Sequence, residues 1–444
     1  MCIPRCVRIM SRARQENLKL TWPHHKIVHN YFRSCQVIKK QDGLQEWTPS
    51  SWMQFPAQQQ PDYPEPASVR YIQQQLQAAP PLVPVSEIQS LTRALKQVSD
   101  GQGFILQCGD CAEAFDQCRE DVLNAWTHTV SQMTGLLHRG LSQPVLRIGR
   151  IAGQYAKPRS SPDEVCNGIS LPSYRGDIVN GHGFSVAERI PDPQRMLGAY
   201  HRAAVTLNAL RNNSAGSSSE STATDSVFDP FYVSHEALLL PYDSALTRLN
   251  PADNQWYNGA AHTVWLGDRT SESSGAHVEY LRGIANPVGI KCGPSMTAEK
   301  LGQLLQRLNP HNKPGKIMLI VRLGVVHIRE KLPLLLQAVA GLNSPVIWLT
   351  DPMHGNTRST VSGLKTRDFD TVCEEVCLFM QILRAQGLHP GGLHLEMTGR
   401  DVTECAGGLQ KIADDNVGGR YESLCDPRLN CSQSAELAGL TGQF

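Results

Sequence analysis

Eight short apolar runs recur along the chain from about residue 104 onward. Each run is three to five residues long, and most are rich in Val, Ile and Leu. Stretches with helical spacing lie between several of them, such as Ala298–Leu308 and Leu332–Leu342. Alternating buried strands and helices predict a parallel sheet, and eight such units predict a (β/α)₈ TIM barrel. The eight runs are Phe104–Gln107, Val145–Ile148, Phe231–Val233, Thr263–Leu266, Val288–Lys291, Ile317–Val321, Val346–Leu349 and Leu393–Leu395.

Almost every run ends in a cluster of polar or charged residues. In a barrel the carboxyl ends of all strands meet on one face, where active sites lie. A doubly wound open sheet is the alternative, but it would gather fewer strand ends around one crevice. The pattern therefore favours a barrel enzyme. The clusters read CGDCAE, RIAGQYAKPRS, SHEALLLPY, GDRT, KCGP, RLG, TDPMHGNT and EMTG.

The chain before the first run predicts an extension and a wrapping segment. Two amphipathic helices are expected there, one near Ser68–Ala78 and one after Ser86, with apolar residues on one face of the second. The polar, low-complexity stretch at 212–227 predicts a disordered surface insert. We therefore expect three parts: a disordered or targeting-like extension at 1–46, a wrapping segment with helices at 47–103, and the catalytic barrel at 104–444.

Composition narrows the class of protein. The 444 residues carry a net charge of +1 with 41% hydrophobic residues, which predicts a large core and no general attraction to nucleic acid or membranes. No run of 18 apolar residues, dinucleotide fingerprint or Walker loop is present. Thirteen scattered cysteines and no secretory signal favour a reducing compartment, hence the cytoplasm. The basic stretch at 1–40 leaves a mitochondrial presequence as the alternative.

Cations concentrate at the predicted strand ends. Six positive charges at one mouth would repel one another unless anions bound there, so they predict a multiply anionic substrate. Any one of them alone would more often form a surface ion pair. The six are Arg150, Lys157, Arg159, Arg269, Lys291 and Arg322.

Four residues of ligating type follow four different elements, namely Cys111, His354, Glu396 and Asp426. A thiolate, an imidazole and two carboxylates suit a divalent transition ion such as Mn²⁺, Co²⁺ or Fe²⁺. No local ligand motif supports the group, and a lone cysteine is more often a small buried hydrophobe. His394 lies inside a strand and is expected to be a core residue or to support a ligand.

Long motifs in this sequence resemble those of class II 3-deoxy-D-arabino-heptulosonate 7-phosphate (DAHP) synthases. The resemblance runs from about Trp47 to about Leu437. The motifs are GDCAE at 109–113, RIAGQYAKPRS at 150–160, SHEALLLPY at 234–242, GDRT at 267–270, GAHVEYLRGIANPVGIKCGP at 275–294, WLTDPMHGNT at 348–357, TGRDVTECAGG at 398–408 and CDPRLN at 425–430.

The resemblance implies a metal-dependent transferase and a homo-oligomer. Such enzymes join phosphoenolpyruvate to erythrose 4-phosphate and water, giving DAHP and phosphate in the first step of the shikimate pathway. The four ligating residues match the family's metal ligands, Mn²⁺ being expected first. Phosphoenolpyruvate is expected against Arg150, Lys157, Arg269, Lys291 and Arg322, beside Trp265 and Asp268. Ser160 and Lys365 match positions for the aldehyde's phosphate, and Asp268, Lys291 and Arg150 are the expected catalytic residues.

Several positions depart from the family pattern. Asp268 stands where Glu is usual for holding a water, and Ser271 and Ser274 replace an Arg and an Asp. The glycine-rich C-terminus weakens the expected closing helix by about 1 kcal/mol per Gly. Cys425 is a candidate for a reversible disulfide with Cys111 that would eject the metal. Two alternatives stay open: a non-catalytic or regulatory paralogue, and a secondary-metabolite synthase that uses an amino-sugar phosphate.

Overall fold

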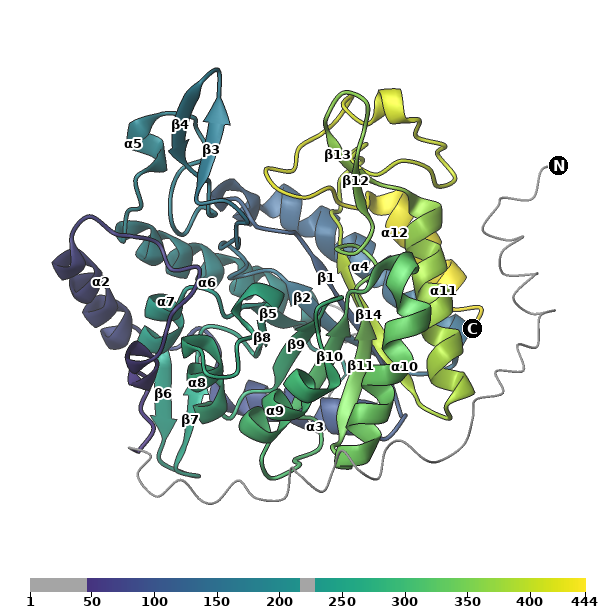
Figure 1. The fold of residues 1–444 in the computed structure, drawn as a ribbon, viewed down its shortest axis with the longest axis horizontal. Helices are drawn as coiled ribbons and strands as arrows, with labels where there is room; N and C mark the ends of the chain where they lie inside the picture. Colours follow the sequence, from purple (N-terminus) through teal and green to yellow (C-terminus); the bar gives the residue numbers. More distant parts are fainter. Residues whose placement is uncertain (1–45, 216–227) are drawn as a thin grey trace. The chain divides into compact units, whose positions relative to one another are not determined.

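A closed barrel of eight parallel strands forms the centre of the structure (Figure 1). The predicted barrel is confirmed, since each of the eight apolar runs falls on one of its strands. In order around the ring, the strands are β1 (Phe104–Gly109), β14 (Pro390–Glu396), β11 (Val346–Thr350), β10 (Ile317–Val321), β9 (Val288–Cys292), β8 (Thr263–Leu266), β5 (Tyr232–Glu236) and β2 (Val145–Arg150). Nearly all of their residues are buried, as expected for strands covered on both faces.

The computed structural model describes residues 46–215 and 228–444. Pro49–Phe444 make up one compact unit. The expected extension at 1–46, with its presequence alternative, lies outside the described residues except for Glu46. The expected insert began too early, because α6 continues to Ala215. Asn, Ser and Ala can complete a last helical turn, and the first helix breaker in that stretch is Gly216. The rest of the insert lies outside the described residues.

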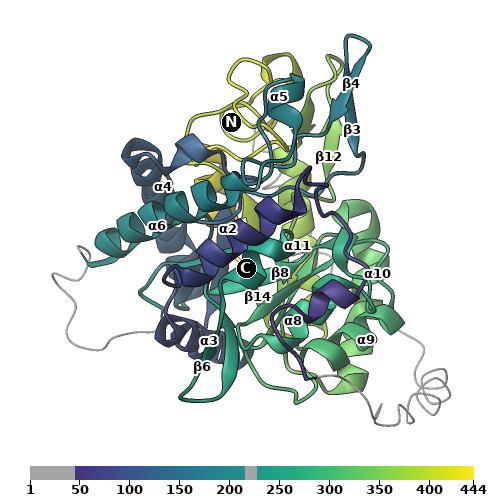
Figure 2. The same cartoon turned by 90° about the vertical axis from the view of Figure 1, so that its left-hand side faces the viewer.

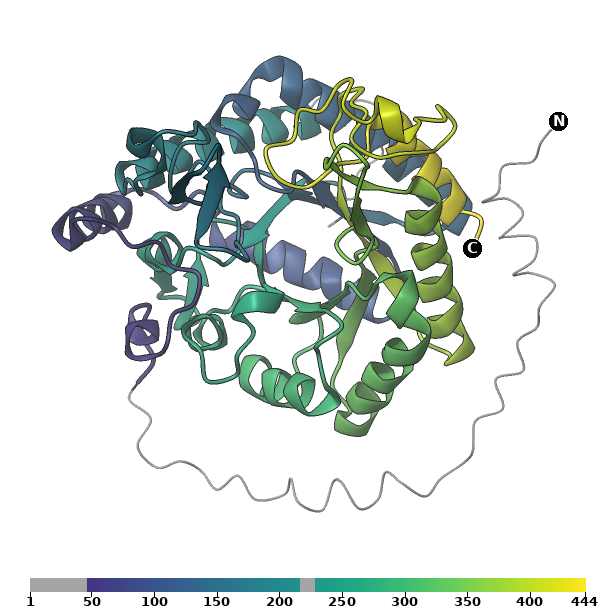
Figure 3. The same ribbon diagram turned by 45° about the horizontal axis from the view of Figure 1, so that its top comes forward.

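Helices surround the ring of strands (Figure 3). The amphipathic sequence positions explain them, as in α9, where four leucines are buried and the Thr297 hydroxyl accepts a bond from the Lys300 amide (3.1 Å). Around the barrel lie α4 (Glu120–Leu141), α6 (Gln194–Ala215), α7 (Leu240–Ala245), α8 (Ala276–Gly283), α9 (Ala298–Leu308), α10 (Gly324–Leu342), α11 (Phe369–Ala385) and α12 (Cys431–Thr441).

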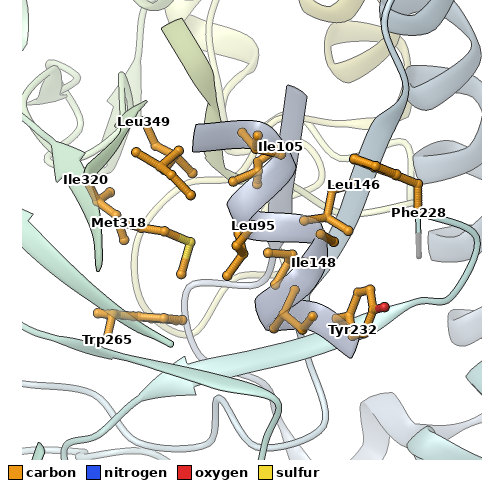
Figure 4. Close-up of a cluster of buried hydrophobic side chains, with 14 residues drawn as sticks. Leu95, Ile105, Leu146, Ile148, Phe228, Tyr232, Trp265, Met318, Ile320 and Leu349 are labelled. Atoms are coloured by element: carbon orange, nitrogen blue, oxygen red, sulfur yellow. The ribbon is translucent and has the colours of Figure 1, made fainter. Parts of the chain in front are cut away.

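Two further helices precede the barrel strands in the chain. The α2 helix (Pro66–Ala78) packs against α6 and α7 on the outside of the barrel (Figure 2). The α3 helix (Val85–Ser99) inserts Leu91, Ala94, Leu95 and Val98 among apolar residues from the strands (Figure 4). The same cluster includes Ile105 from β1 and Met318 from β10 at the amino-terminal half of the barrel, so α3 closes the end opposite the strand termini that carry the polar clusters.

Two antiparallel hairpins rise from the carboxyl end of the barrel (Figure 1). One consists of β3 (Asp163–Cys166) and β4 (Ile169–Pro172), followed by the short helix α5 (Val186–Arg189). The other consists of β12 (Thr357–Ser359) and β13 (Lys365–Arg367). A third hairpin, β6 (Thr247–Asn250) with β7 (Gln255–Asn258), follows α7. The first two were not expected from sequence, and they flank the opening of the barrel.

The closing helix α12 forms despite its glycines. Asn430 and Gln433 make a reciprocal capping box at its start, which supplies partners for free amides. A Cβ at Gly140 of α4 would lie 2.3 Å from the Gly442 carbonyl oxygen, so glycine lets the two segments touch. Of the C-terminal glycines, Gly442 lies in this close contact with α4, whereas a Cβ at Gly439 would meet open space.

Candidate active site

A pocket of about 260 Å³ opens at the carboxyl ends of the barrel strands. Every residue that the sequence singled out for metal or substrate lines it. They are Cys111, Arg150, Lys157, Arg159, Ser160, Trp265, Asp268, Arg269, Lys291, Arg322, His354, Lys365, Glu396 and Asp426. The barrel topology therefore brings together residues that lie as far as 315 positions apart in the chain.

Four of these residues gather their ligating atoms in one place. One atom each from Cys111, His354, Glu396 and Asp426 lies within 4.8 Å of the others. The His354 Nε2 is 3.0 Å from Glu396 Oε1, and Cys111 Sγ is 3.5 Å from Asp426 Oδ2. This spacing and the mixed sulfur, nitrogen and oxygen donors fit a divalent metal ion.

Buried cations hold one of the candidate ligands, Glu396, in its ionised form. Burial alone would raise the pKa of this carboxyl, but His354 and Arg367 keep it well below its usual value. Arg367, fully buried, lies 2.8 Å from Glu396 Oε2 and also donates to the carbonyl of Pro427. Arg150 donates to Glu396 Oε1 at 3.1 Å. Because a carboxylate must be ionised to bind a metal, this arrangement prepares Glu396 as a ligand.

Asp351 connects the candidate metal ligands to the cationic side of the pocket. Its Oδ2 is 2.7 Å from His354 Nδ1 and 2.5 Å from Lys291 Nζ. Burial would raise its pKa, but His354 and Lys291 keep it well below the usual value. A carboxylate on Nδ1 leaves Nε2 of His354 directed at the cluster, as in many metal sites.

The cations line the rest of the pocket, from Trp265 to the candidate metal ligands, where Lys157 contacts Cys111 and Asp426. Arg150 lies over the indole ring at 5.1 Å and Lys291 at 5.9 Å. Arg322 is paired with Asp268 at 2.7 Å. Burial lowers the pKa of Lys291 to about 8, although Asp351 opposes the shift. These groups together form a site for a small, strongly anionic molecule.

The segment behind Arg269 is held despite its polar sequence. Ser271 is buried, and its hydroxyl donates to the Asp268 carbonyl at 2.8 Å. The Ser273 hydroxyl donates to Gln303 at 3.0 Å. A short 3₁₀ helix, Asp268–Thr270, precedes them. Local hydrogen bonds thus support the loop in which two serines replace the charged residues of the family pattern.

The rim of the pocket carries the remaining expected residues. Arg159 and Ser160 lie just before the β3–β4 hairpin, and Lys365 begins β13 in the other hairpin. The Lys365 ammonium is 2.9 Å from Asp426 Oδ1, and Arg159 pairs with Glu164 on β3. Both hairpins therefore bring cations to the opening from opposite sides.

Two residues near the centre support others rather than face the pocket. His394 is fully buried. Its Nδ1 donates to Gln107 Oε1 at 2.8 Å, and its Nε2 accepts from Arg150. Cys425 lies within hydrogen-bond reach of the Cys111 thiol, whose pKa burial raises well above its usual value. The expected disulfide between these two cysteines remains a prediction.

Sequence reasoning missed several residues of the site. Arg367 binds Glu396 through a tertiary contact that no local spacing reveals, whereas Asp351 lies three residues before His354 in the cluster TDPMHGNT. Glu236, Gln154 and Thr357 also line the pocket. The signal for Glu236 was present, because it ends an apolar run within the cluster SHEALLLPY.

The comparisons with known proteins agree on one family. The model of the "Class-II DAHP synthetase family" matches residues 47–229 and 213–441. A phospho-2-dehydro-3-deoxyheptonate aldolase of Streptomyces coelicolor is 44% identical over 434 residues, covering 89% of this chain and 96% of the relative. Phospho-2-dehydro-3-deoxyheptonate aldolase AroG of Mycolicibacterium smegmatis is 40% identical over 433 residues, covering 88% and 92%.

A solved structure of a phospho-2-dehydro-3-deoxyheptonate aldolase from Francisella tularensis SCHU S4 also aligns with this chain. The alignment covers 85% of this chain and 95% of that chain, with 12% identity and a TM-score of 0.47. This structural similarity is too low to support a fold assignment, so the barrel assignment rests on the strand pairing described above. Among the described residues, no helix has the length and apolarity that a membrane span requires.

Proposed function

The chain belongs to the class-II DAHP synthetase family, which condenses phosphoenolpyruvate with erythrose 4-phosphate, and we propose which of its residues perform that reaction. The product is DAHP, and the reaction is the first step of the shikimate pathway, which leads to the aromatic amino acids. The enzyme is a transferase.

Phosphoenolpyruvate binds along the cationic wall, in contact with Arg150, Lys157, Arg269, Lys291 and Arg322. Its carboxylate and phosphate bring about three negative charges, which offset the mutual repulsion of these groups. Trp265 provides a rigid floor, since it is 1% exposed and belongs to the apolar cluster below. Fixing both anionic ends of the substrate orients C3, the carbon that forms the new bond.

Erythrose 4-phosphate enters between the two hairpins. Arg159, Ser160 and Lys365 hold its phosphate at the rim, which directs the aldehyde inward. A divalent metal held by Cys111, His354, Glu396 and Asp426 would polarise the aldehyde carbonyl as a Lewis acid. Mn²⁺ is the first candidate, with Co²⁺ and Fe²⁺ as alternatives, because all three accept this mixed donor set.

The chain's own residues then control the carbon chemistry. C3 of phosphoenolpyruvate attacks the aldehyde carbon, and positive character develops at C2. Asp268 and Lys291 border C2 and orient the water that attacks there, while Arg150 and Arg322 stabilise the phosphate that leaves. No side-chain nucleophile is required for this sequence of steps.

The arrangement of the pocket is the observation that carries the proposal. Two groups of side chains face the same 260 Å³ space. One is the metal-type group, Cys111, His354, Glu396 and Asp426, and the other is the set of cations that suits an anion. Asp351 bonds to one member of each group. A non-catalytic paralogue would have no need for both groups, and the ordered Ser271 loop removes one reason for that alternative. We also propose that the chain forms a homo-oligomer, which light scattering on the purified protein would test.

Product analysis tests the proposed function. Purified protein with both substrates and Mn²⁺ is expected to yield DAHP and phosphate in equal amounts, identified by mass spectrometry. An amino-sugar phosphate offered in competition should be consumed far more slowly. Preference for the amino sugar would support the secondary-metabolite alternative, and binding of phosphoenolpyruvate without turnover would support the non-catalytic one.

A further inference from the structure

Glu236 is a pocket carboxylate that the roles above leave unused. Four carboxylates line the pocket, and two of them, Glu396 and Asp426, belong to the metal-type group. A third, Asp268, has its Oδ2 occupied by Arg322 at 2.7 Å. Among the described residues, the Glu236 side chain makes no ion pair or hydrogen bond, and its Oε1 is buried without a partner. An unpartnered buried carboxylate oxygen is costly, so its retention calls for a reason.

The backbone around Glu236 fixes where its carboxylate lies. Its amide donates to Gln154 Oε1 at 2.8 Å at the end of β5. A Cβ at Gly267 would lie only 1.9 Å from Glu236 Oε1, so the glycine leaves room for the carboxylate. The carboxylate therefore rests against the first residue of the GDRT segment, directly before Asp268.

The surroundings of Glu236 suit a group that gains and loses a proton. Burial raises the pKa of its carboxyl above the usual value, against the opposing effect of Lys291, Lys157, Arg150 and His354. A carboxylate in such a site accepts a proton more readily than one in water, which is what a general base requires.

The position of β5 in the ring decides which reacting atom Glu236 faces. β5 lies between β2, which ends in Arg150, and β8, which carries Trp265. In the closed ring, β5 lies four strands from β11, and the end of β11 leads to His354. Glu236 therefore lies between the strand ends that carry Arg150 and Trp265, on the side assigned to phosphoenolpyruvate and across the barrel from His354.

We propose that Glu236 is the general base that takes a proton from the water attacking C2. This inference rests on the proposed function and adds a catalytic residue to it. Asp268 keeps its role of orienting the water and Arg322, because its Oδ2 is already paired with Arg322.

The proton transfers balance over the whole reaction. The water oxygen forms a bond to C2 and one of its protons passes to Glu236. The former aldehyde oxygen takes up one proton and becomes a hydroxyl. The C2–O bond to phosphate then breaks as the new C2 hydroxyl loses its remaining proton and becomes a ketone, and hydrogen phosphate leaves. The two protons of water thus end on the new hydroxyl and on the phosphate, and Glu236 returns to its starting form.

Kinetics of three variants test this role in the full-length protein with Mn²⁺. E236Q should lower kcat by about 10²–10⁴-fold while the Kd for phosphoenolpyruvate and the bound Mn²⁺ stay within about threefold of wild type. E236A should show a similar loss, of which added formate restores a part. D268N should instead raise the KM for phosphoenolpyruvate more than it lowers kcat, since it releases Arg322.

The outcomes separate this inference from the proposed function. An inactive wild type would remove the proposed function itself. An active wild type with E236Q at near-normal kcat would overturn the inference alone. So would a parallel loss of substrate or metal binding in E236Q, which would indicate a structural role, or the absence of any formate effect on E236A.

Discussion

One carboxylate, Asp351, couples the two halves of the active site. Its Oδ2 lies 2.5 Å from Lys291 and 2.7 Å from His354, and its side chain is fully buried. The negative charge that orients the proposed metal ligand His354 therefore also holds the proposed substrate-binding ammonium of Lys291 in place. A change at either partner is expected to affect both metal and substrate binding, because both partners contact the same carboxylate oxygen.

The buried ammonium of Lys291 predicts a limit on activity at alkaline pH. Burial lowers its pKa to about 8, so the group is charged below that pH and loses its charge above it. Only the charged form attracts the phosphoenolpyruvate carboxylate. We expect kcat/KM for phosphoenolpyruvate to fall about tenfold per pH unit above about pH 8, measured in a pH series of initial rates.

The control for this prediction is Lys291→Arg. A guanidinium remains charged throughout the series, so the alkaline fall should disappear even if the maximum is lower. A fall of the same shape in the arginine variant would assign the titration to another group.

At the residue scale, sequence reasoning could identify the chemistry of the site but not its support. Cys111, Glu396 and the six cations belong to polar clusters directly after apolar runs, which is a local signal. Arg367 carries no such signal, because its partners Glu396 and Pro427 come near it only in the folded chain. Buried ion pairs of this kind depend on tertiary packing alone.

At the scale of elements, the hairpin β12–β13 serves as a support for the metal-type group. Its last residue, Arg367, pairs with Glu396 and donates to the backbone beside Asp426. Its first residue in β13, Lys365, pairs with Asp426 itself. The hairpin was not predicted, since three-residue strands leave little periodicity in a sequence. The barrel strands were predictable because eight apolar runs recur along the chain and stretches with helical spacing lie between several of them.

Replacing Arg367 by Gln should weaken both the fold and the metal site. The change leaves Glu396 buried with one fewer counter-ion, which should lower the free energy of unfolding by about 3 kcal/mol. Metal affinity should fall about 10–100-fold, because the ligand and the Asp426 loop lose their support. Urea unfolding and titration with Mn²⁺ would measure the two effects.

Arg358→Gln in the same hairpin is the matched control. Arg358 pairs with Asp368 and Asp414 near the surface, so its loss should cost about 1 kcal/mol or less and leave metal affinity unchanged. Equal effects of the two variants would mean that the hairpin as a whole, rather than Arg367, supports the site.

Helix α3 predicts a second effect at this scale. Leu95 is fully buried among residues of the barrel strands, so Leu95→Ala should lower the free energy of unfolding by about 2–5 kcal/mol through the cavity it leaves. The neighbouring Lys96 is exposed, and Lys96→Ala should change stability by about 0.5 kcal/mol or less. Similar unfolding midpoints for both variants would show that α3 is not part of the barrel core.

For the whole molecule, the barrel brings two kinds of chemistry into one pocket, where Arg150 contacts Glu396 and Lys157 contacts Cys111 and Asp426. Strands β1, β11 and β14 lead to Cys111, His354 and Glu396, and the strands from β8 to β10 together with β2 carry the cations and Trp265. The closed ring brings both sets to one end, and α3 seals the other end. In the proposed function, this convergence lets two anionic substrates meet with the aldehyde carbonyl beside the candidate metal ligands.

The most direct test measures how fast the purified protein consumes phosphoenolpyruvate in the presence of erythrose 4-phosphate and Mn²⁺, with and without EDTA. The same assay is run on Cys111→Ser and on a control variant at an exposed cysteine, Cys166→Ser. We predict consumption that requires the aldehyde and the metal, is lost with EDTA, falls at least about 100-fold in Cys111→Ser and is unchanged in Cys166→Ser. Full activity in EDTA, or in Cys111→Ser, would contradict the assignment of the metal site.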